Sequence, residues 1–81
     1  MSRKGERLFI LTIYNRHGEL CGRLRRYAKL DTAAARAVQL LILNGKPCDV
    51  AELAHIGTGK QLGWASVQAN GTVTCFWDWE I

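Results

Sequence analysis

The segment Ala54–Gln61 is the closest approach of this chain to a phosphate-binding loop. Such a loop has a glycine, four residues and then Gly-Lys-Ser/Thr, because backbone N–H groups cradle the phosphates, the lysine reaches them and the hydroxyl binds magnesium. Gly59 and Lys60 fit this pattern, but Ala54 replaces the first glycine and Gln61 replaces the hydroxyl. The segment also does not follow a predicted strand. The sequence therefore argues against nucleotide hydrolysis.

Histidine and cysteine residues are the next candidates for chemistry. A cysteine nucleophile needs a nearby base, and a zinc site needs several ligands at characteristic spacings. His17 and His55 have no cysteine at such a spacing, and no oxyanion-stabilising loop is recognisable. The cysteines are odd in number and form no Cys-x-x-Cys pair: Cys21, Cys48 and Cys75. This pattern predicts buried free thiols in a reducing compartment.

The carboxylates near the end of the chain could bind a cation. Asp78 and Glu80 alternate there, an arrangement more typical of a solvated terminus than of a metal site. With no nucleophile–base pair, ligand set or phosphate loop, we expect no catalytic residue, no metal and no cofactor. The sequence thus favours a protein that is not an enzyme.

Positive charge is concentrated in the first third of the chain. Residues 1–30 carry eight Lys/Arg and two Glu, a net charge of +6, whereas residues 31–81 carry three Lys/Arg and five acids, a net charge of −2. Clustered cations repel one another, so they favour an acidic partner, although a charge run can also be only a solvated face. The candidate partner-binding residues are Arg23, Arg25, Arg26 and Lys29, with Tyr27 and Arg16 at the edge.

Three tryptophans in the last third form a second candidate patch. Trp64, Trp77 and Trp79 would share one face of a hairpin. Large aromatic side chains in a small domain are usually core, but exposed tryptophan beside arginine is typical of a binding hot spot. The opposite face of the same strand carries Gly63, Ala65 and Val67, which would suit close helix packing. Both alternatives stay open at this stage.

The element that must position these groups is a helix over Asp31–Gly45. Asp31 is a good N-cap, and Asn44-Gly45 before Pro47 is a typical stop, with glycine free to adopt the left-handed conformation. Between them, Ala34, Ala37, Val38 and Leu41 fall on one face at helical spacing. The alanines would let a β-sheet approach this face closely.

Two strands are expected before this helix. Leu8–Tyr14 is β-branched and aromatic and predicts an inner strand, followed by a turn at Asn15–Gly18. Glu19–Ala28 fits either a returning strand or a helix. The strand is favoured because Gly22 weakens a helix, and it would place Arg23, Arg25 and Tyr27 together on one face.

A short helix and a hairpin are expected after it. Asp49–Glu52 has the form of a capping box before a two-turn helix that ends at Gly57. Asn70-Gly71 is the preferred pair for a two-residue type I′ turn, between strands over residues 62–68 and 72–79. That register places Trp64 opposite Trp77, Leu62 opposite Trp79 and Ser66 opposite Cys75.

The whole chain therefore predicts one small α+β domain, residues 1–81, with the order β-β-α-α-β-β. Its sheet would have four antiparallel strands, with both helices on one side. No apolar run reaches the ~20 residues of a membrane span, and the apolar run after the basic start is too short for a secretory signal. We therefore expect a cytoplasmic protein.

In layout the chain resembles the small proteins of phages and mobile elements, and among these it is most similar to the anti-CRISPR proteins. Several of them have a hairpin, one alanine-rich helix introduced by Asp/Ser-Thr, and further strands, as Asp31–Ala37 suggests here. They share no common motif, so no site residue carries over, and many are acidic whereas this chain is basic. The resemblance implies a stoichiometric inhibitor in the host bacterial cytoplasm.

Two functional hypotheses follow. In the first, a non-enzymatic inhibitor binds a CRISPR surveillance complex or another nucleic-acid-handling protein or ribonucleoprotein complex through its basic surface, and blocks nucleic-acid binding. In the second, the chain is a small basic DNA- or RNA-binding module. Salt separates them, because direct phosphate contacts make affinity for naked nucleic acid fall steeply with ionic strength. The sequence does not specify the oligomeric state.

Overall fold

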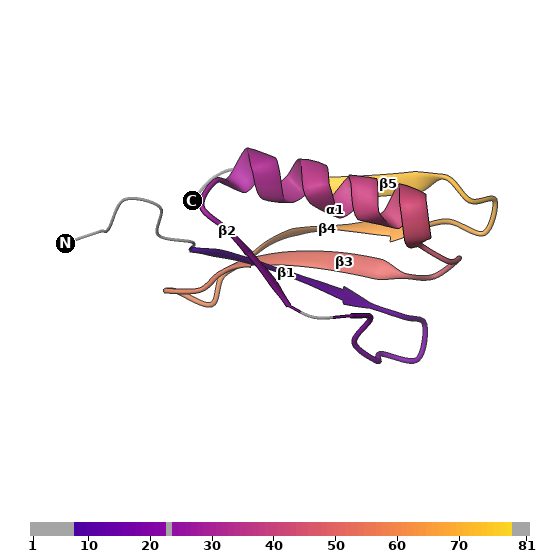
Figure 1. Cartoon of the computed structure of the whole chain (residues 1–81), viewed down its shortest axis with the longest axis horizontal. Helices are drawn as coiled ribbons and strands as arrows, with labels where there is room; N and C mark the ends of the chain where they lie inside the picture. The colour runs from indigo at the N-terminus through magenta and orange to yellow at the C-terminus, as the bar shows by residue number, and fades with distance from the viewer. Residues whose placement is uncertain (1–7, 23, 79–81) are drawn as a thin grey trace.

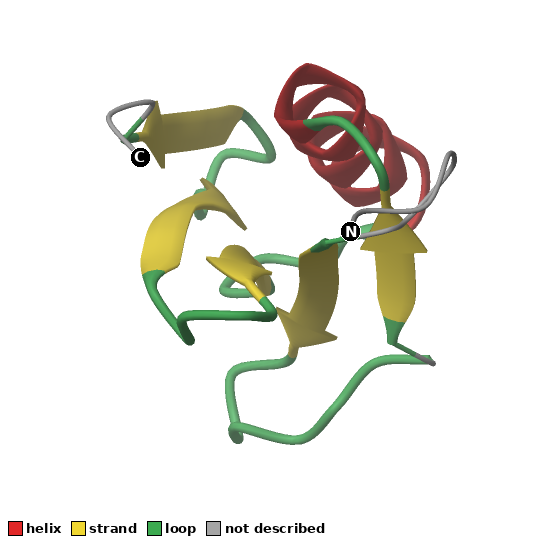
Figure 2. Cartoon of the chain, turned by 90° about the vertical axis from the view of Figure 1, so that its left-hand side faces the viewer, coloured by secondary structure: helices red, strands yellow, loops and turns green. Residues whose placement is uncertain are grey.

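The computed structural model describes residues 8–22 and 24–78, which form one five-stranded antiparallel sheet and one helix. The order across the sheet is β2-β1-β3-β4-β5. The helix lies on one side of the sheet, between the two outer strands (Figures 1 and 2). The elements are β1 (Phe9–Tyr14), β2 (Arg25–Tyr27), α1 (Leu30–Asn44), β3 (Val50–His55), β4 (Gln61–Val67) and β5 (Val73–Trp77).

The α+β class is confirmed, but the expected four strands and two helices become five strands and one helix in the described part of the chain. None of the described helical structure has both the length and the apolar character needed to cross a lipid bilayer.

The helix α1 confirms the alanine-rich pattern, although its ends differ from the expectation. Lys29 is the N-cap and makes no side-chain cap, while Asp31 lies in the first turn, where its carboxylate accepts a hydrogen bond from the Thr32 N–H. Gly45 is extended (φ −71°, ψ 142°) instead of left-handed, and its N–H donates to the Leu41 carbonyl. The Asp31 charge still suits the positive end of the helix dipole.

The hydrophobic core lies between α1 and the side of the sheet that we call the helix face. Three alanines of α1 are buried and allow the helix to approach the strands closely. Ala65 and Val67 of β4 are buried beneath it, as the small-residue pattern of that strand suggested. The core consists of Leu11, Ala33, Ala34, Ala37, Leu40, Leu41, Ala51, Leu53, Leu62, Ala65 and Val67.

The predicted second helix is wrong, because Val50–His55 is the central strand of the sheet. Residues 51 and 53 alternate into the core, and β3 pairs with β1 on one side and β4 on the other. The expected capping box does not form. The Asp49 carboxylate accepts from the Lys46 N–H at 2.9 Å, and Glu52 accepts from Gln61 Nε2 at 3.3 Å.

The first hairpin is confirmed, with a returning strand much shorter than expected. β1 lies between β2 and β3, so it is an inner strand. β2 contains only Arg25–Tyr27. Nearer the turn, the two arms are joined by an isolated bridge between Tyr14 and Leu20, where the Cys21 N–H donates to the Ile13 carbonyl. Gly22 has a φ of 75°, which interrupts extended structure before β2.

The last hairpin is confirmed, but its predicted register is wrong by one residue. The Gly71 N–H donates to the Gln68 carbonyl and Gly71 has a φ of 89°, which makes a three-residue loop in place of the two-residue turn. Trp64 therefore lies opposite Phe76, and Trp77 opposite Gly63. Because side chains alternate between faces, this shift puts Trp64 and Trp77 on opposite sides of the sheet.

The other expected cross-strand pairs change with the register. Ser66 lies opposite Thr74, and Ala65 opposite Cys75. The expected pair of Leu62 with Trp79 involves a residue outside the described part of the chain. An irregularity in the β3–β4 pairing at Leu53/Ala54 accompanies Gly63, whose φ is 145°.

Candidate functional site: the open face of the sheet

The side of the sheet turned away from α1 is the open face. The registers place alternate residues of the strands on it, from Arg26 beside Ile10 to Phe76 beside Trp64, and the irregularity in the β3–β4 pairing interrupts this alternation between Gln61 and Trp64. No described helix covers this side (Figures 1 and 2). The open face consists of Ile10, Thr12, Tyr14, Arg26, Val50, Glu52, Ala54, Gln61, Trp64, Ser66, Thr74 and Phe76.

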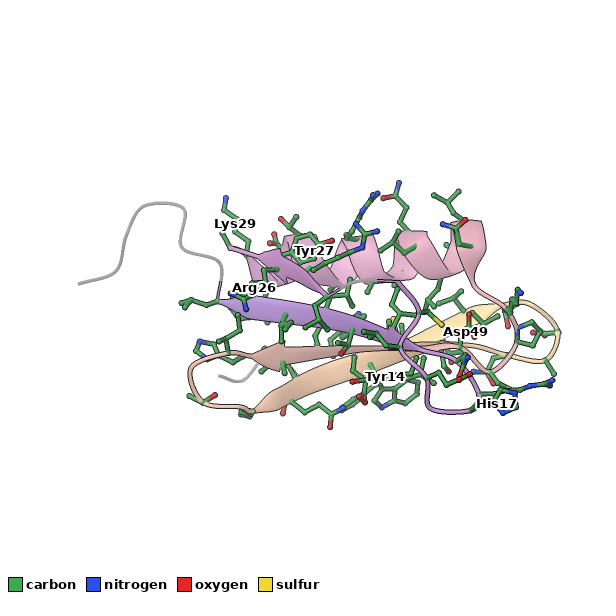
Figure 3. All side chains as sticks on the ribbon, turned by 60° about the horizontal axis from the view of Figure 1, so that its bottom comes forward. Tyr14, His17, Arg26, Tyr27, Lys29 and Asp49 are labelled. Atoms are coloured by element: carbon green, nitrogen blue, oxygen red, sulfur yellow. The ribbon has the colours of Figure 1, made fainter. Side chains whose placement is uncertain are left out.

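Two exposed aromatic side chains lie side by side on β4 and the edge strand β5, at one side of the open face. Trp64 and Phe76 are direct cross-strand neighbours, and their exposed fractions are 40% and 60%. Tyr14, half-buried, lies on the same face at the end of β1 (Figure 3). Exposing a paired tryptophan and phenylalanine to water is unfavourable, so such a patch typically marks a contact surface.

Beside these aromatic residues the open face is mixed: it carries the apolar Ile10, Val50 and Ala54 as well as polar side chains. The side chains of Thr12, Ser66 and Thr74 offer hydroxyl groups. Arg26 and Glu52 are its two charged residues among the described ones, so their charges cancel. The arrangement is an apolar patch along the β5 side of the face with hydrogen-bonding groups beside it, and protein–protein interfaces commonly combine apolar and polar groups in this way.

The predicted basic site is divided between the two faces of the sheet. Arg26 is exposed on the open face, whereas Arg25 and Tyr27 point to the helix side, opposite Leu11 and Phe9. Arg25 and Tyr27 therefore share a face, as the alternation predicted, but α1 lies on that side. Tyr27 packs against the core.

Two more of the predicted cations lie at the two ends of the molecule. Lys29 is exposed just before α1, near Arg26, whereas Arg16 belongs to the turn that contains His17 at the other end (Figure 3). Arg16 lines a cleft of about 400 Å³ with Lys46 and the buried Asp49. Arg23 lies outside the described residues. The structure thus leaves Arg26 and Lys29 at one end of the molecule and Arg16 at the other.

The tryptophan patch is divided as well. Trp64 belongs to the open face, while Trp77 is half-buried and packs against the core on the helix side. Trp77 is therefore part of the core packing, whereas Trp64 is exposed. Trp79 lies outside the described residues. Phe76 and Tyr14 were missed by sequence reasoning, although the correct register of the last hairpin would have indicated Phe76.

The described part of the chain contains histidine, cysteine and carboxylate side chains of the kinds that bind metal ions. No three histidine, cysteine or carboxylate side chains there are placed to hold a metal ion. The cysteines are free thiols: Cys21 is half-buried, while Cys48 and Cys75 are exposed, so the expected burial is wrong for these two. A second cleft, of about 270 Å³, lies beneath the end of α1 and is lined mainly by Ile13, Cys21, Arg25, Leu40, Leu41 and Asp49.

Comparison with known proteins adds no assignment. No protein-family model, curated protein or solved structure matches the chain.

Proposed function

We propose that this chain is a non-enzymatic binding protein that docks the open face of its sheet on the surface of a protein partner. The observation that carries the proposal is the exposed pair of Trp64 and Phe76 on the β4–β5 side of a face whose two charged described residues, Arg26 and Glu52, offset each other. Buried aromatic anchors dominate the energetics of many protein interfaces, and the polar groups around them exclude water. A matching apolar pocket on the partner would receive these two rings.

The charge of the open face favours a protein partner over nucleic acid. Binding to phosphates requires several cations along one surface, whereas here Glu52 offsets Arg26. Arg26 and the nearby Lys29 lie at one end of the molecule, where they would meet acidic side chains of the partner. The order of elements resembles that of anti-CRISPR proteins, so we propose that this partner is a bacterial nucleic-acid-handling complex, such as a CRISPR surveillance complex. The bound chain would inhibit it stoichiometrically.

The second candidate function is single-stranded nucleic-acid binding. One observation favours it: three aromatic side chains, Tyr14, Trp64 and Phe76, lie on one face of an antiparallel sheet. Bases stack on such platforms in several nucleic-acid-binding modules. The overall net charge of +4 is compatible with this function, but the neutral open face makes it the weaker candidate.

The test removes the aromatic pair and compares it with a matched apolar pair elsewhere. The wild-type chain should capture a partner from nuclease-treated bacterial lysate by saturable binding. The double variant Trp64→Ala, Phe76→Ala should lose this capture, because removing each aromatic anchor is expected to lower the affinity about 30-fold or more. The control is Ile42→Ala with Leu43→Ala, since both side chains are 66% exposed on α1. This control should bind like the wild type.

The outcome decides between the candidates. If the aromatic double variant stays folded and captures the partner at wild-type affinity, the open face is not the binding surface. Fluorescence titration with single-stranded oligonucleotides at two salt concentrations tests the alternative. Tight binding that falls steeply with salt and is lost in the aromatic variant would replace the protein partner by nucleic acid.

A further inference from the structure

The outer edge of β5 has backbone groups that the described chain leaves unpaired. β5 ends the sheet, next to β4 alone. In its ladder, the Gln68 N–H donates to the Thr72 carbonyl and the Asp78 N–H donates to the Leu62 carbonyl, both at 2.7 Å. The direction of the backbone hydrogen-bonding groups alternates along an antiparallel strand, so the N–H and C=O groups of the even-numbered residues of β5 point to β4. Val73, Cys75 and Trp77 therefore direct their N–H and C=O groups to the outer edge.

The two edges of this sheet differ in how they are protected. β2 has three residues, two of them the charged Arg25 and Arg26, and short charged edges resist pairing with other strands. β5 is Val-Thr-Cys-Phe-Trp, five residues of high β-propensity without a charge or proline. Cys75 is exposed on the helix face of β5 and Phe76 is exposed on its open face, so a second strand could approach the edge from either face. The β5 edge therefore has the length and composition of a strand that can form hydrogen bonds with a further strand.

The sequence of β5 is complementary to itself when it runs antiparallel. Centred on Cys75, the pairing places Cys75 opposite Cys75 of a second copy, Val73 opposite Trp77, and Thr74 opposite Phe76. Each aromatic residue then meets a β-branched one, which is a favourable cross-strand combination. No like charges meet, and the outward groups of the odd-numbered residues would form about six backbone hydrogen bonds.

We propose that two copies of this chain associate through their β5 edges in a two-fold symmetric dimer with Cys75 on the axis. The interface is isologous and closed, because each copy uses its single β5 edge. The two sheets become one continuous sheet of ten strands. If the open face is the binding surface proposed above, the Trp64 and Phe76 side chains of both copies lie near the centre of the joined face, so the dimer binds two partner molecules or one symmetric partner.

Sedimentation velocity over a range of chain concentrations tests the dimer directly. The wild type should sediment at twice the mass of a single chain. Cys75→Lys should sediment as a monomer, because two ammonium groups would face each other across the axis. Cys75→Pro should do the same, since it removes only an N–H that points away from β4. The matched control is Cys48→Lys, at an exposed cysteine outside the strands, which should remain dimeric.

A short bis-maleimide tests the register. Paired residues that exchange hydrogen bonds lie about 5.5 Å apart between Cα atoms. A chain with Cys21→Ser and Cys48→Ser retains Cys75 alone and should give a cross-linked dimer in native buffer. A chain with Cys21→Ser and Cys75→Ser retains Cys48 and should not.

Three results would overturn the proposal: a monomeric wild type at every concentration, a Cys75→Lys variant that still dimerises, or equal cross-linking through Cys48 and Cys75. Circular dichroism and a melting curve check the fold of each variant, and Cys75→Lys carries the test if Cys75→Pro does not fold.

A monomeric wild type whose partner capture is lost in Cys75→Lys would assign the edge to a strand of the partner. A dimer whose aromatic double variant binds normally would refute the binding surface and leave the dimer standing.

Discussion

Replacing Gly63 by alanine would test the close approach between β4 and β5. Gly63 has a φ of 145°, and a Cβ built there would lie 2.2 Å from the Phe76 carbonyl oxygen and 2.7 Å from Trp77 Cε3. The backbone conformation alone costs about 1–3 kcal/mol for a residue other than glycine. The clash adds about 1–3 kcal/mol, because the nearest atom is backbone and the Trp77 ring must shift. We expect Gly63→Ala to lose about 2–6 kcal/mol of unfolding free energy.

This loss is large for a domain of this size. A chain of 81 residues has a stability of about 4–12 kcal/mol. Urea unfolding followed by tryptophan fluorescence measures the change, and near-ultraviolet circular dichroism reports the displaced Trp77 ring. The matched control is Gly71→Ala: its φ is 89°, but nothing lies within 4 Å of the added Cβ. It should lose only about 1–2 kcal/mol. Equal losses in the two variants would refute the steric argument, and a change below 1 kcal/mol at Gly63 would refute both parts of it.

Three further stability predictions follow from burial and hydrogen bonding. Leu53→Ala removes a fully buried side chain from the central strand and should cost about 2–5 kcal/mol in urea unfolding; a cost below 1 kcal/mol would place Leu53 outside the core. Asp49→Ala deprives the Lys46 N–H of its acceptor and should cost about 1–3 kcal/mol, with Asp49→Asn restoring part of the loss. Ile42→Ser, at a side chain that is 66% exposed, should change stability by less than about 0.5 kcal/mol and leave the melting temperature nearly unchanged.

The candidate site shows where sequence reasoning reached its limit. Alternation along β2 correctly separated Arg25 from Arg26, because side-chain direction in a strand depends only on sequence position. The packing of α1 on the sheet decides which of these two faces is covered. The sequence alone therefore did not show that Arg26 would lie on the open face while Arg25 would lie on the helix side.

The last hairpin illustrates a second limit. Asn70-Gly71 correctly predicted a chain reversal, because glycine readily adopts the left-handed conformation that such loops need. The same pair fits a two-residue loop and the last positions of a three-residue loop. The three-residue loop that forms shifts every cross-strand pair by one, so that Phe76, and not Trp77, joins Trp64 on the open face.

By itself the sequence determined the elements whose signals are local: the strand that ends at Tyr14, the alanine-rich helix and the chain reversal of the final hairpin. Only the tertiary structure decided the state of residues 50–55. Their apolar spacing fits a helical stripe as well as a strand, and two further strands, β1 and β4, supply hydrogen-bonding partners on both sides. The partner β1 lies about forty residues earlier in the chain. No local pattern contains that pairing, since the free energy that selects the strand arises from contacts between distant segments.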